Sequence, residues 1–132
     1  MEAIVASGPV IVENGKLLVN RDKSDEFFKL PGRKIREGES AEECCIRETK
    51  EEINGEVKIL RPLSHMVLWK KPQSGENILV VLIHYLARIK NRDLKPGKGI
   101  VEIKWLDVNE IKKGKHNVGP NIKFLIEKGD IK

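Results

Sequence analysis

The chain has 132 residues, a length that predicts one domain, 1–132, with little room for a second. Its hydrophobic fraction of 39% falls in short periodic runs, which is not the pattern of a disordered chain, and its longest apolar run, 78–83, is far too short to cross a membrane. The net charge of +5 favours an anionic partner such as a phosphate-bearing molecule, although lysines on solvated faces would also produce it.

The chain opens with a predicted β-hairpin. Residues 3–12 are expected to form the first strand and residues 16–20 the return strand, because Asn14-Gly15 between them favours a two-residue turn. A short apolar segment at 27–30 follows a loop, and Pro31-Gly32 then breaks the chain.

The best-defined helix is predicted to begin at Ser40. Ser40 and Glu43 have the spacing of a capping box, and Glu39 and Glu42 suit the positive end of the helix dipole. Asn54-Gly55 ends the helix, since either residue tolerates the left-handed conformation that closes one.

The second half of the chain is rich in predicted strands. Residues 57–69 are strand-rich, and residues 78–89 form the most apolar strand, which is expected at the centre of a sheet. The elements expected after it are a strand at 101–106, a short helix opened by the capping-box spacing of Asp107 and Glu110, and a helix at 121–128 between Gly119-Pro120 and Gly129. This order predicts an α/β fold with a mixed sheet flanked by helices.

Two adjacent cysteines, Cys44 and Cys45, fall in the first predicted helix. Neighbours on a helix point about 100° apart, so the two thiols are a poor pair for one disulfide or one metal ion. We expect both to be buried small residues, which implies a reducing cytoplasm. The N-terminus also lacks the basic start and apolar core of a signal peptide.

Acidic residues gather on one face late in that helix. Glu48, Glu51 and Glu52 have i, i+3, i+4 spacing, so their like charges repel unless hard cations such as Mg²⁺ lie among them. Arg47 could pin one of the acids, and Glu39 could join the cluster from the loop-to-helix junction. The alternative is a solvated acidic face with basic partners. The preceding Pro31-Gly32 loop favours the metal site, because it would bring backbone carbonyls close to the acids.

This arrangement resembles the signature of the Nudix hydrolases, the MutT-like family. Their Nudix box reads Gly, five residues, Glu, seven residues, then Arg-Glu-apolar-any-Glu-Glu-any-Gly-apolar. In this chain Glu39 is followed by seven residues and then Arg47-Glu48, with Glu51-Glu52 in register. The preceding residues 30–32 and Gly38 also look like the loop of that family.

The resemblance implies a Nudix-type α/β/α sandwich with a mixed β-sheet. It also implies a metal-dependent hydrolase that uses Mg²⁺ or Mn²⁺ to cleave the diphosphate linkage of a nucleoside diphosphate derivative, ADP-ribose-like or a (d)NTP. Pro72 falls near a position where ADP-ribose-cleaving members often carry a proline. The implied partner is this small molecule, with no membrane, and the protein is expected to be a monomer or homodimer.

The resemblance also assigns roles to residues of this chain. The implied catalytic residues are Arg47, Glu48, Glu51 and Glu52, and the implied metal ligands are Gly32 through its carbonyl, Glu39, Glu48, Glu51 and Glu52. The general base stays open between Glu48 and an acid from a later loop. Glu102 is a second candidate acid, with a surface salt bridge as the alternative. Arg33, Lys34 and Glu102 are the candidate substrate-binding residues.

Three positions depart from the box and make it slightly degenerate. Asn54 stands where the box has its second Gly, and Asn is the next-best residue for a left-handed cap. Thr49 replaces an aliphatic residue and should face the sheet, with its hydroxyl in need of a partner. Arg33 stands at the first Gly; if that position needs positive φ, the cost is about 1 kcal/mol or more, whereas its guanidinium could hold a substrate phosphate.

Two other functions remain as alternatives. The altered box motivates a non-catalytic Nudix-like domain that binds a nucleotide or a protein. A basic nucleic-acid-binding protein is not expected, because the positive charges are scattered and not clustered with aromatic residues.

Overall fold

The computed structural model describes residues 2–71, 75–97 and 99–132, so Pro72 lies outside the described residues. The elements in chain order are β1 (Glu2–Val10), β2 (Val12–Glu13), β3 (Lys16–Asp22), β4 (Arg33–Lys34), α1 (Ala41–Ile53), β5 (Val57–Pro62), β6 (Met66–Lys70), β7 (Ile78–Ile89), β8 (Ile100–Asp107), α2 (Val108–Lys112) and α3 (Pro120–Glu127). None of the helices in these described ranges is long and apolar enough to cross a membrane.

The strands form two sheets. The larger has the order β4-β1-β7-β5, with β6 also paired to β7, and the smaller has the order β2-β3-β8. The larger sheet is mixed, because β1 runs parallel to β7 while the other strands pair antiparallel. The prediction that the apolar strand 78–89 is central is confirmed, since β7 pairs with β1, β5 and β6. The strand-rich segment 57–69 is two strands, which pair with different stretches of β7.

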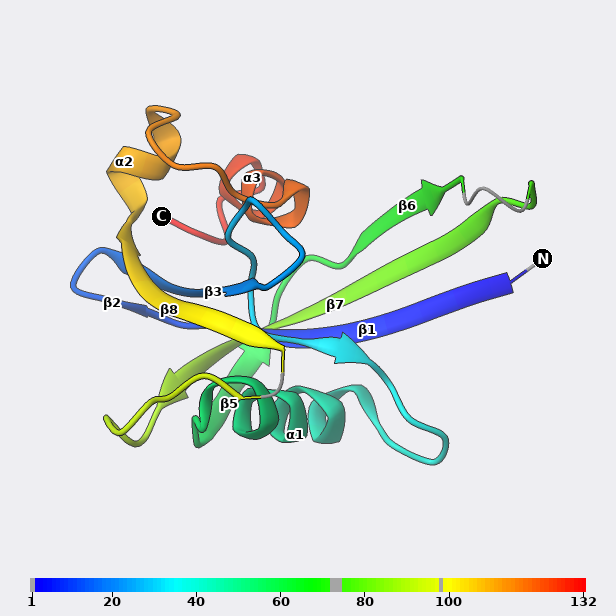
Figure 1. The fold of residues 1–132 in the computed structure, drawn as a ribbon, viewed down its shortest axis with the longest axis horizontal. Coiled ribbons are helices and arrows are strands. Elements are labelled where there is room, and N and C mark those ends of the chain that lie inside the picture. Colours follow the sequence, from blue (N-terminus) through cyan, green and yellow to red (C-terminus); the bar gives the residue numbers. More distant parts are fainter. Residues whose placement is uncertain (1, 72–74, 98) are drawn as a thin grey trace.

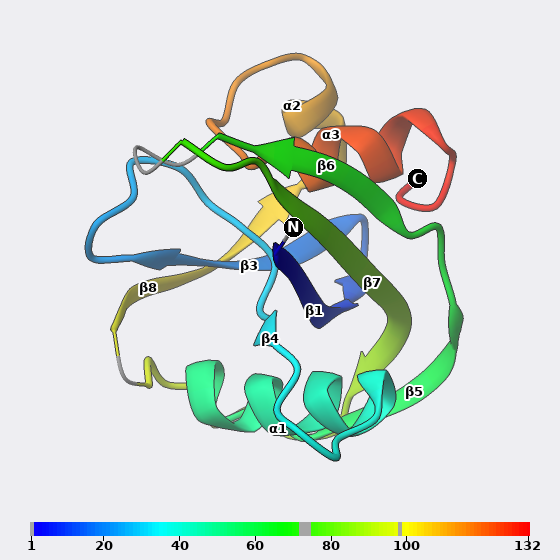
Figure 2. The same cartoon turned by 90° about the vertical axis from the view of Figure 1, so that its right-hand side faces the viewer.

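Helices cover the sheets on two sides, so the expected α/β sandwich is confirmed. In Figure 1, α1 lies on one side of the strands while α2 and α3 lie on the other, and Figure 2 shows the same layers after a quarter turn. Strand β3 lies between two cores because its side chains alternate: Leu17 and Val19 pack in the core that holds Ile122, whereas Leu18 packs with Ile53. The site described below lies on the α1 side.

Helix α1 has the caps that its sequence predicts. Ser40 and Glu43 form a reciprocal capping box, and Asn54 closes the helix in the left-handed conformation, with φ 54°. Cys44 and Cys45 are fully buried and free, as expected. These caps fix where the helix begins and ends, and therefore which residues face the sheet.

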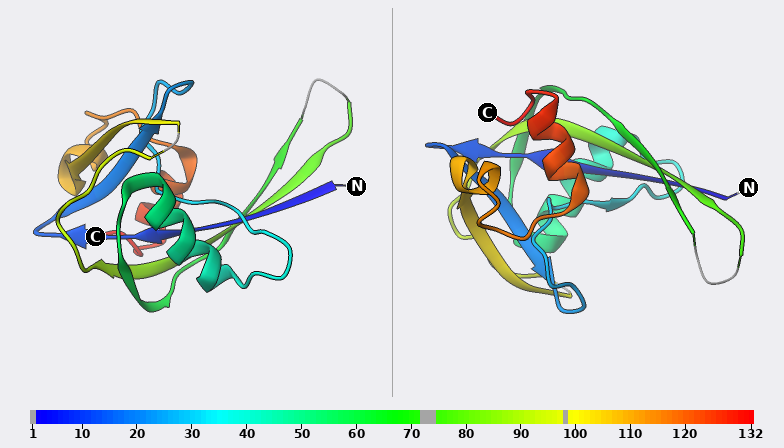
Figure 3. Two further views of the ribbon diagram at one scale, coloured as in Figure 1. Left: turned by 60° about the horizontal axis from the view of Figure 1, so that its bottom comes forward. Right: turned by 90° about the horizontal axis from the view of Figure 1, so that it is seen from above.

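Beyond the helices, one part of the larger sheet projects as an arm. The arm consists of the N-terminal part of β1 with β6 and the first half of β7 (Figure 3). Val67 and Trp69 on β6 are 55% and 57% exposed, so this end of the sheet lies outside the cores.

Candidate active site

An open cavity of about 700 Å³ lies beside α1. Its walls come from α1, from the end of β3, from the segment that begins at β4 and from the loop before β8. The residues that line it are Asp22, Lys23, Ser24, Arg33, Arg36, Glu48, Glu51, Glu52 and Gly99. The three acids predicted to share one helix face therefore open into the same cavity.

The three acids differ in burial. Glu48 and Glu52 are only 4% and 2% exposed, whereas the side chain of Glu51 is 47% exposed. Burial raises the pKa of the Glu52 carboxyl, against hydrogen bonds from Gly32 and Arg33 that lower it. Two carboxylates at the floor of a cavity are costly unless cations accompany them.

Arg47 supplies much of that compensation. Its guanidinium donates to both oxygens of Glu39, at 2.6 and 2.9 Å, and to Glu48 at 2.5 Å and Glu51 at 3.0 Å. It also donates to the carbonyl of Lys34 at 3.4 Å. The planar fork of arginine suits this arrangement, in which one cation joins the helix to the preceding loop.

Glu39 is held in its ionised form by these contacts. The hydrogen bonds from Arg47, followed by the backbone N–H of Arg36, lower the pKa of Glu39 from 4.5 to about 2. Both of its oxygens accept from Arg47, so in this arrangement Glu39 orients the arginine. Its expected role as a metal ligand would require one oxygen to leave that pair.

This lowered pKa predicts a pH dependence of stability. A depressed pKa in the folded state stabilises the fold fully above the unfolded pKa, and the stabilisation is lost as the pH falls from about 5 towards 2. We expect Glu39→Gln to lower the urea midpoint of unfolding at pH 7 and to make little difference near pH 2. Unfolding curves from pH 2 to 7 would measure this. Glu37→Gln, at an exposed position, is the matched control; an equal loss at every pH for Glu39→Gln would contradict the ion-pair account.

The loop before α1 is fixed by a close contact with β1. A Cβ atom added at Gly8 would lie 1.9 Å from the carbonyl oxygen of Pro31, and one added at Gly32 would lie 2.4 Å from the carbonyl oxygen of Ser7. Gly32 also has a φ of 139°, which side chains rarely adopt. This packing aims the Gly32 N–H at Glu52, to which it donates at 2.5 Å. The ligand role of the Gly32 carbonyl stays a prediction.

Arg33 is tied to two acids. Its guanidinium donates to Glu52 at 3.0 Å and to Asp22 at 3.2 Å. Asn14 and Asn54 are the non-glycine residues with positive φ in the described ranges, so Arg33 does not carry the backbone strain considered for this position. It pairs with Ser7 in the short β4 strand.

Thr49 behaves as expected from its position. It is fully buried, and its hydroxyl donates to the carbonyl of Cys45 at 2.7 Å. The buried hydroxyl of Thr49 therefore has a hydrogen-bond partner within its own helix.

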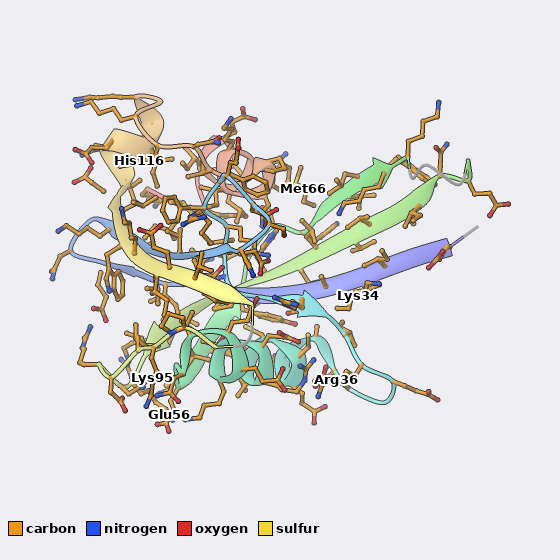
Figure 4. All side chains as sticks on the ribbon, viewed as in Figure 1. Lys34, Arg36, Glu56, Met66, Lys95 and His116 are labelled. Atoms are coloured by element: carbon orange, nitrogen blue, oxygen red, sulfur yellow. The ribbon has the colours of Figure 1, made fainter. Side chains whose placement is uncertain are left out.

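Two other residues predicted to bind substrate, Lys34 and Glu102, are not among the described residues that line this cavity. Glu102 forms ion pairs with Arg21 at 3.1 Å and with Lys104 at 3.3 Å. The structure therefore agrees with the surface salt bridge that was the alternative for this residue. Lys34 is exposed and follows Arg33 in β4, and both Lys34 and Arg36 come from the segment that leads into α1 (Figure 4).

Sequence reasoning missed five residues that line the cavity: Asp22, Lys23, Ser24, Arg36 and Gly99. Asp22 lies at an irregularity in the pairing of β3 with β8 and forms ion pairs with Lys29 and Arg33. Arg36 donates to Glu51 at 3.4 Å. No spacing rule connects these positions with α1, because loops that are distant in sequence bring them together.

The donor set suits a hard divalent cation. The carboxylates at the cavity supply the oxygen ligands that Mg²⁺ and Mn²⁺ prefer, and two of these carboxylates, those of Glu48 and Glu52, are buried. As the side chains stand, no three acidic, histidine or cysteine residues in the described part of the chain converge on one point that could hold an ion. Arg47 holds one oxygen of Glu48, and Arg33 holds one oxygen of Glu52. An ion that bound this oxygen of Glu52 would compete with Arg33.

Comparison with known proteins agrees with this geometry. The family model described as "NUDIX domain" matches residues 2–125. The ADP-ribose pyrophosphatase of Methanocaldococcus jannaschii is 29% identical over 112 residues, which are 83% of this chain and 64% of that protein. The m7GpppN-mRNA hydrolase of Saccharomyces cerevisiae is 26% identical over 123 residues, 92% of this chain but 12% of that protein. The chain thus spans less than two thirds of the length of either relative.

Solved structures share the fold. The MutT protein from Methanosarcina mazei Go1 superposes with a TM-score of 0.76 at 18% identity, covering 98% of this chain and 94% of that chain. A NUDIX hydrolase from Nitrosomonas europaea superposes with a TM-score of 0.69 at 23% identity, covering 96% of this chain and 87% of that one. At these identities the structures establish the architecture alone.

Proposed function

Because the chain belongs to the Nudix hydrolase family, we propose that it is a metal-dependent pyrophosphohydrolase that cleaves the diphosphate linkage of a nucleoside diphosphate derivative. The observation that carries this proposal is the pair of buried carboxylates, Glu48 and Glu52, at the floor of an open cavity. A surface acidic face would leave such groups in water, where their charges cost little.

Each residue of the cluster has a proposed role. Glu48, Glu51 and Glu52, with Glu39 and the Gly32 carbonyl, would hold Mg²⁺ or Mn²⁺. When bound, such an ion polarises the phosphoryl group and lowers the pKa of a water molecule. Arg47 holds Glu48 and Glu51 in position through its hydrogen bonds. A carboxylate of the cluster would take the proton of the attacking water, and Glu48, the more buried of the two acids that Arg47 holds in the cavity, is our candidate for this base.

The cations around the cavity would bind the substrate. Arg33, Arg36 and Lys23 line it, so a diphosphate would meet guanidinium and ammonium groups opposite the acids. ADP-ribose and (d)NTPs are the first substrates to test. The name of the archaeal relative, ADP-ribose pyrophosphatase, supports the former.

A substrate panel tests the proposal. The protein is incubated with ADP-ribose, NADH, UDP-glucose and the dNTPs in the presence of Mg²⁺ or Mn²⁺, and the products are separated by ion-exchange chromatography. We expect release of a nucleoside monophosphate from at least one substrate, and none when EDTA is present. Tight binding of a nucleotide without turnover of any substrate would instead support the non-catalytic binding domain.

Arg33 should compete with a metal ion for Glu52. The guanidinium of Arg33 donates to Glu52 at 3.0 Å. Removing this guanidinium leaves the cavity with one positive charge fewer beside the carboxylate of Glu52. We expect Arg33→Ala to tighten Mn²⁺ binding in the absence of substrate by about tenfold, because a unit charge a few ångströms away contributes on the order of 1–2 kcal/mol at a partly exposed site. Calorimetric titration would measure it. Arg36→Ala, which removes a longer contact to the exposed Glu51, should change the affinity less.

We also propose a cytoplasmic location. The support is the pair of free, buried cysteines, Cys44 and Cys45. Burial raises the pKa of these thiols to about 11 and about 12, so neither is reactive at neutral pH.

A further inference from the structure

The projecting arm has an open edge, which is formed by β6. In Figure 1, β6 is the outermost strand of the arm, on the side of β7 that is opposite to β1. In the part of the chain that the structure describes, β6 pairs with β7 alone, through Met66–Lys70. No other described backbone group hydrogen-bonds to the backbone of these residues. The N–H and C=O groups on the outer side of β6 are therefore available to another strand.

The other edge strands of the larger sheet are protected against such pairing. Strand β4 has two residues. Strand β5 carries Lys58 and Arg61, ends at Pro62 and has an irregularity in its register with β7. Charges, proline and irregular register are the features that keep natural edge strands from pairing with other chains. In contrast, β6 is in continuous register with β7, and its one charged residue is Lys70 at its end.

One face of the arm is apolar across its three strands. Residues that lie opposite one another in paired strands point to the same face of the sheet. Six residues in register, two from each strand of the arm, share this face: Ala3, Val5, Val67, Trp69, Leu79 and Val81. The two on β6, Val67 and Trp69, are 55% and 57% exposed. An exposed apolar surface beside an open strand edge is typical of an interaction site.

Strand β6 is complementary to a second copy of itself. In an antiparallel pair with a two-fold axis at Leu68, Val67 of one copy lies opposite Trp69 of the other, and the axis repeats this contact. Pairs of an aromatic and a β-branched side chain stabilise antiparallel strands. Lys70 lies opposite Met66 in this register, so no like charges meet. The same register keeps the apolar faces of both arms on one side.

We propose that two copies of this chain associate through β6, so that their arms form one continuous sheet across a two-fold axis. The partner is a second copy because this register matches each exposed apolar residue of β6 with another and leaves no charge opposed. The inference goes beyond the proposed reaction and does not depend on it, since none of the described residues that line the catalytic cavity lies in β6.

The expected interface is small. A buried tryptophan contributes about 150–250 Å², so two Trp69 side chains together with the paired strands would bury on the order of 1,000 Å². Stable interfaces bury about 1,200–2,000 Å². The net charge of +5 on each copy also opposes association. We therefore expect a reversible dimer with a dissociation constant on the order of 10 µM, which tightens as salt screens the repulsion.

Sedimentation velocity of the full chain tests the proposal. Samples from about 1 µM to about 300 µM bracket the expected dissociation constant. We expect a concentration-dependent shift from monomer to dimer, at lower protein concentration in about 0.5 M NaCl than in about 0.05 M NaCl. A wild-type protein that stays monomeric over this range would overturn the proposal and leave the edge of β6 to a strand from another protein.

Substitutions at the apolar face locate the interface. Val67→Glu and Trp69→Lys each place a charge at two symmetric apolar positions, so each should weaken association at least about tenfold. Val101→Glu is the matched control, because it puts the same charge at a valine that is 46% exposed on β8. We expect this control to dimerise like the wild type. An equal loss in Val101→Glu, or no loss in the two β6 variants, would place the interface elsewhere.

An equimolar mixture of Val67→Glu and Trp69→Lys tests the register. In the mixed dimer the introduced carboxylate of one chain lies opposite the introduced ammonium of the other, while the unchanged Trp69 and Val67 meet at the second position. We expect the mixture to associate about tenfold more tightly than either variant alone, a gain that misfolded variants would not show. No gain from variants whose circular dichroism matches that of the wild type would overturn the proposed pairing.

Discussion

Arg47→Met is expected to lower the free energy of unfolding at pH 7 by about 3 kcal/mol and to remove catalytic activity. Glu48 is only 4% exposed and accepts a hydrogen bond from Arg47, so the variant leaves a buried carboxylate without its cation. Breaking a buried ion pair by removing one partner costs about 3–5 kcal/mol, and the partial exposure of Arg47 favours the lower end. Methionine keeps the unbranched stem, so lost packing contributes little. Urea unfolding and the rate of substrate hydrolysis measure the two effects.

Two further variants separate charge from geometry. Arg47→Lys keeps the cation but loses the fork that holds both oxygens of Glu39, and we expect an intermediate loss of stability. Arg36→Met removes an arginine that is 63% exposed and donates to Glu51 at 3.4 Å, and it should change stability by no more than about 0.5 kcal/mol. A loss below about 1 kcal/mol for Arg47→Met would show that the acids are compensated by other groups.

Glu52→Gln is expected to lower kcat on the order of 10³-fold while leaving the protein folded. The amide has nearly the same shape but no charge, and, in the proposed mechanism, the loss of one carboxylate from the metal site removes several kcal/mol of stabilisation from the transition state. The fold loses one hydrogen bond, because a glutamine oxygen can replace the acceptor for Gly32 or for Arg33 but not for both. Burial, which raises the pKa of Glu52, offsets part of this cost. Steady-state kinetics with the best substrate, together with Mn²⁺ titration, would measure the change.

The control for this change is Glu42→Gln, an exposed acid on the same helix away from the cavity. We expect normal kinetics and normal Mn²⁺ affinity from it. If Glu52→Gln hydrolyses the substrate at the wild-type rate, Glu52 has no part in the metal site. If it loses activity but binds Mn²⁺ normally, its role is instead to hold Arg33 and the Gly32 loop.

Local patterns in the sequence predicted the elements that depend on a few neighbouring residues. The capping box of Ser40 and Glu43, the left-handed cap at Asn54 and the turn at Asn14-Gly15 are all present. These features depend on backbone groups within one turn, so residue type and spacing suffice to predict them. The same reasoning placed Glu48 and Glu52 on one helix face.

Sequence spacing could not predict the partners of the acids. The sequence suggests backbone strain or substrate binding for Arg33, yet its guanidinium donates to Glu52 and Asp22, which lie in elements distant from it along the chain. Asp22 comes to the cavity because β3 pairs with β8 and the loop before β8 returns beside α1. Such contacts depend on how sheets and loops pack, and the spacing of residues along the chain does not predict that packing.

For the stretch from Gly32 to Glu52, the sequence by itself determined the helix, the spacing of its acids and the family to which the chain belongs. The tertiary structure alone decided which carboxylates are buried and which arginine neutralises each of them. The physical reason is that helix periodicity is set by local hydrogen bonds, whereas the cost of a charge depends on the solvent and counter-ions that distant segments exclude or supply. The hydrogen bond from Arg33 to Glu52 is such a contact, because it joins two segments that are 19 residues apart in the chain.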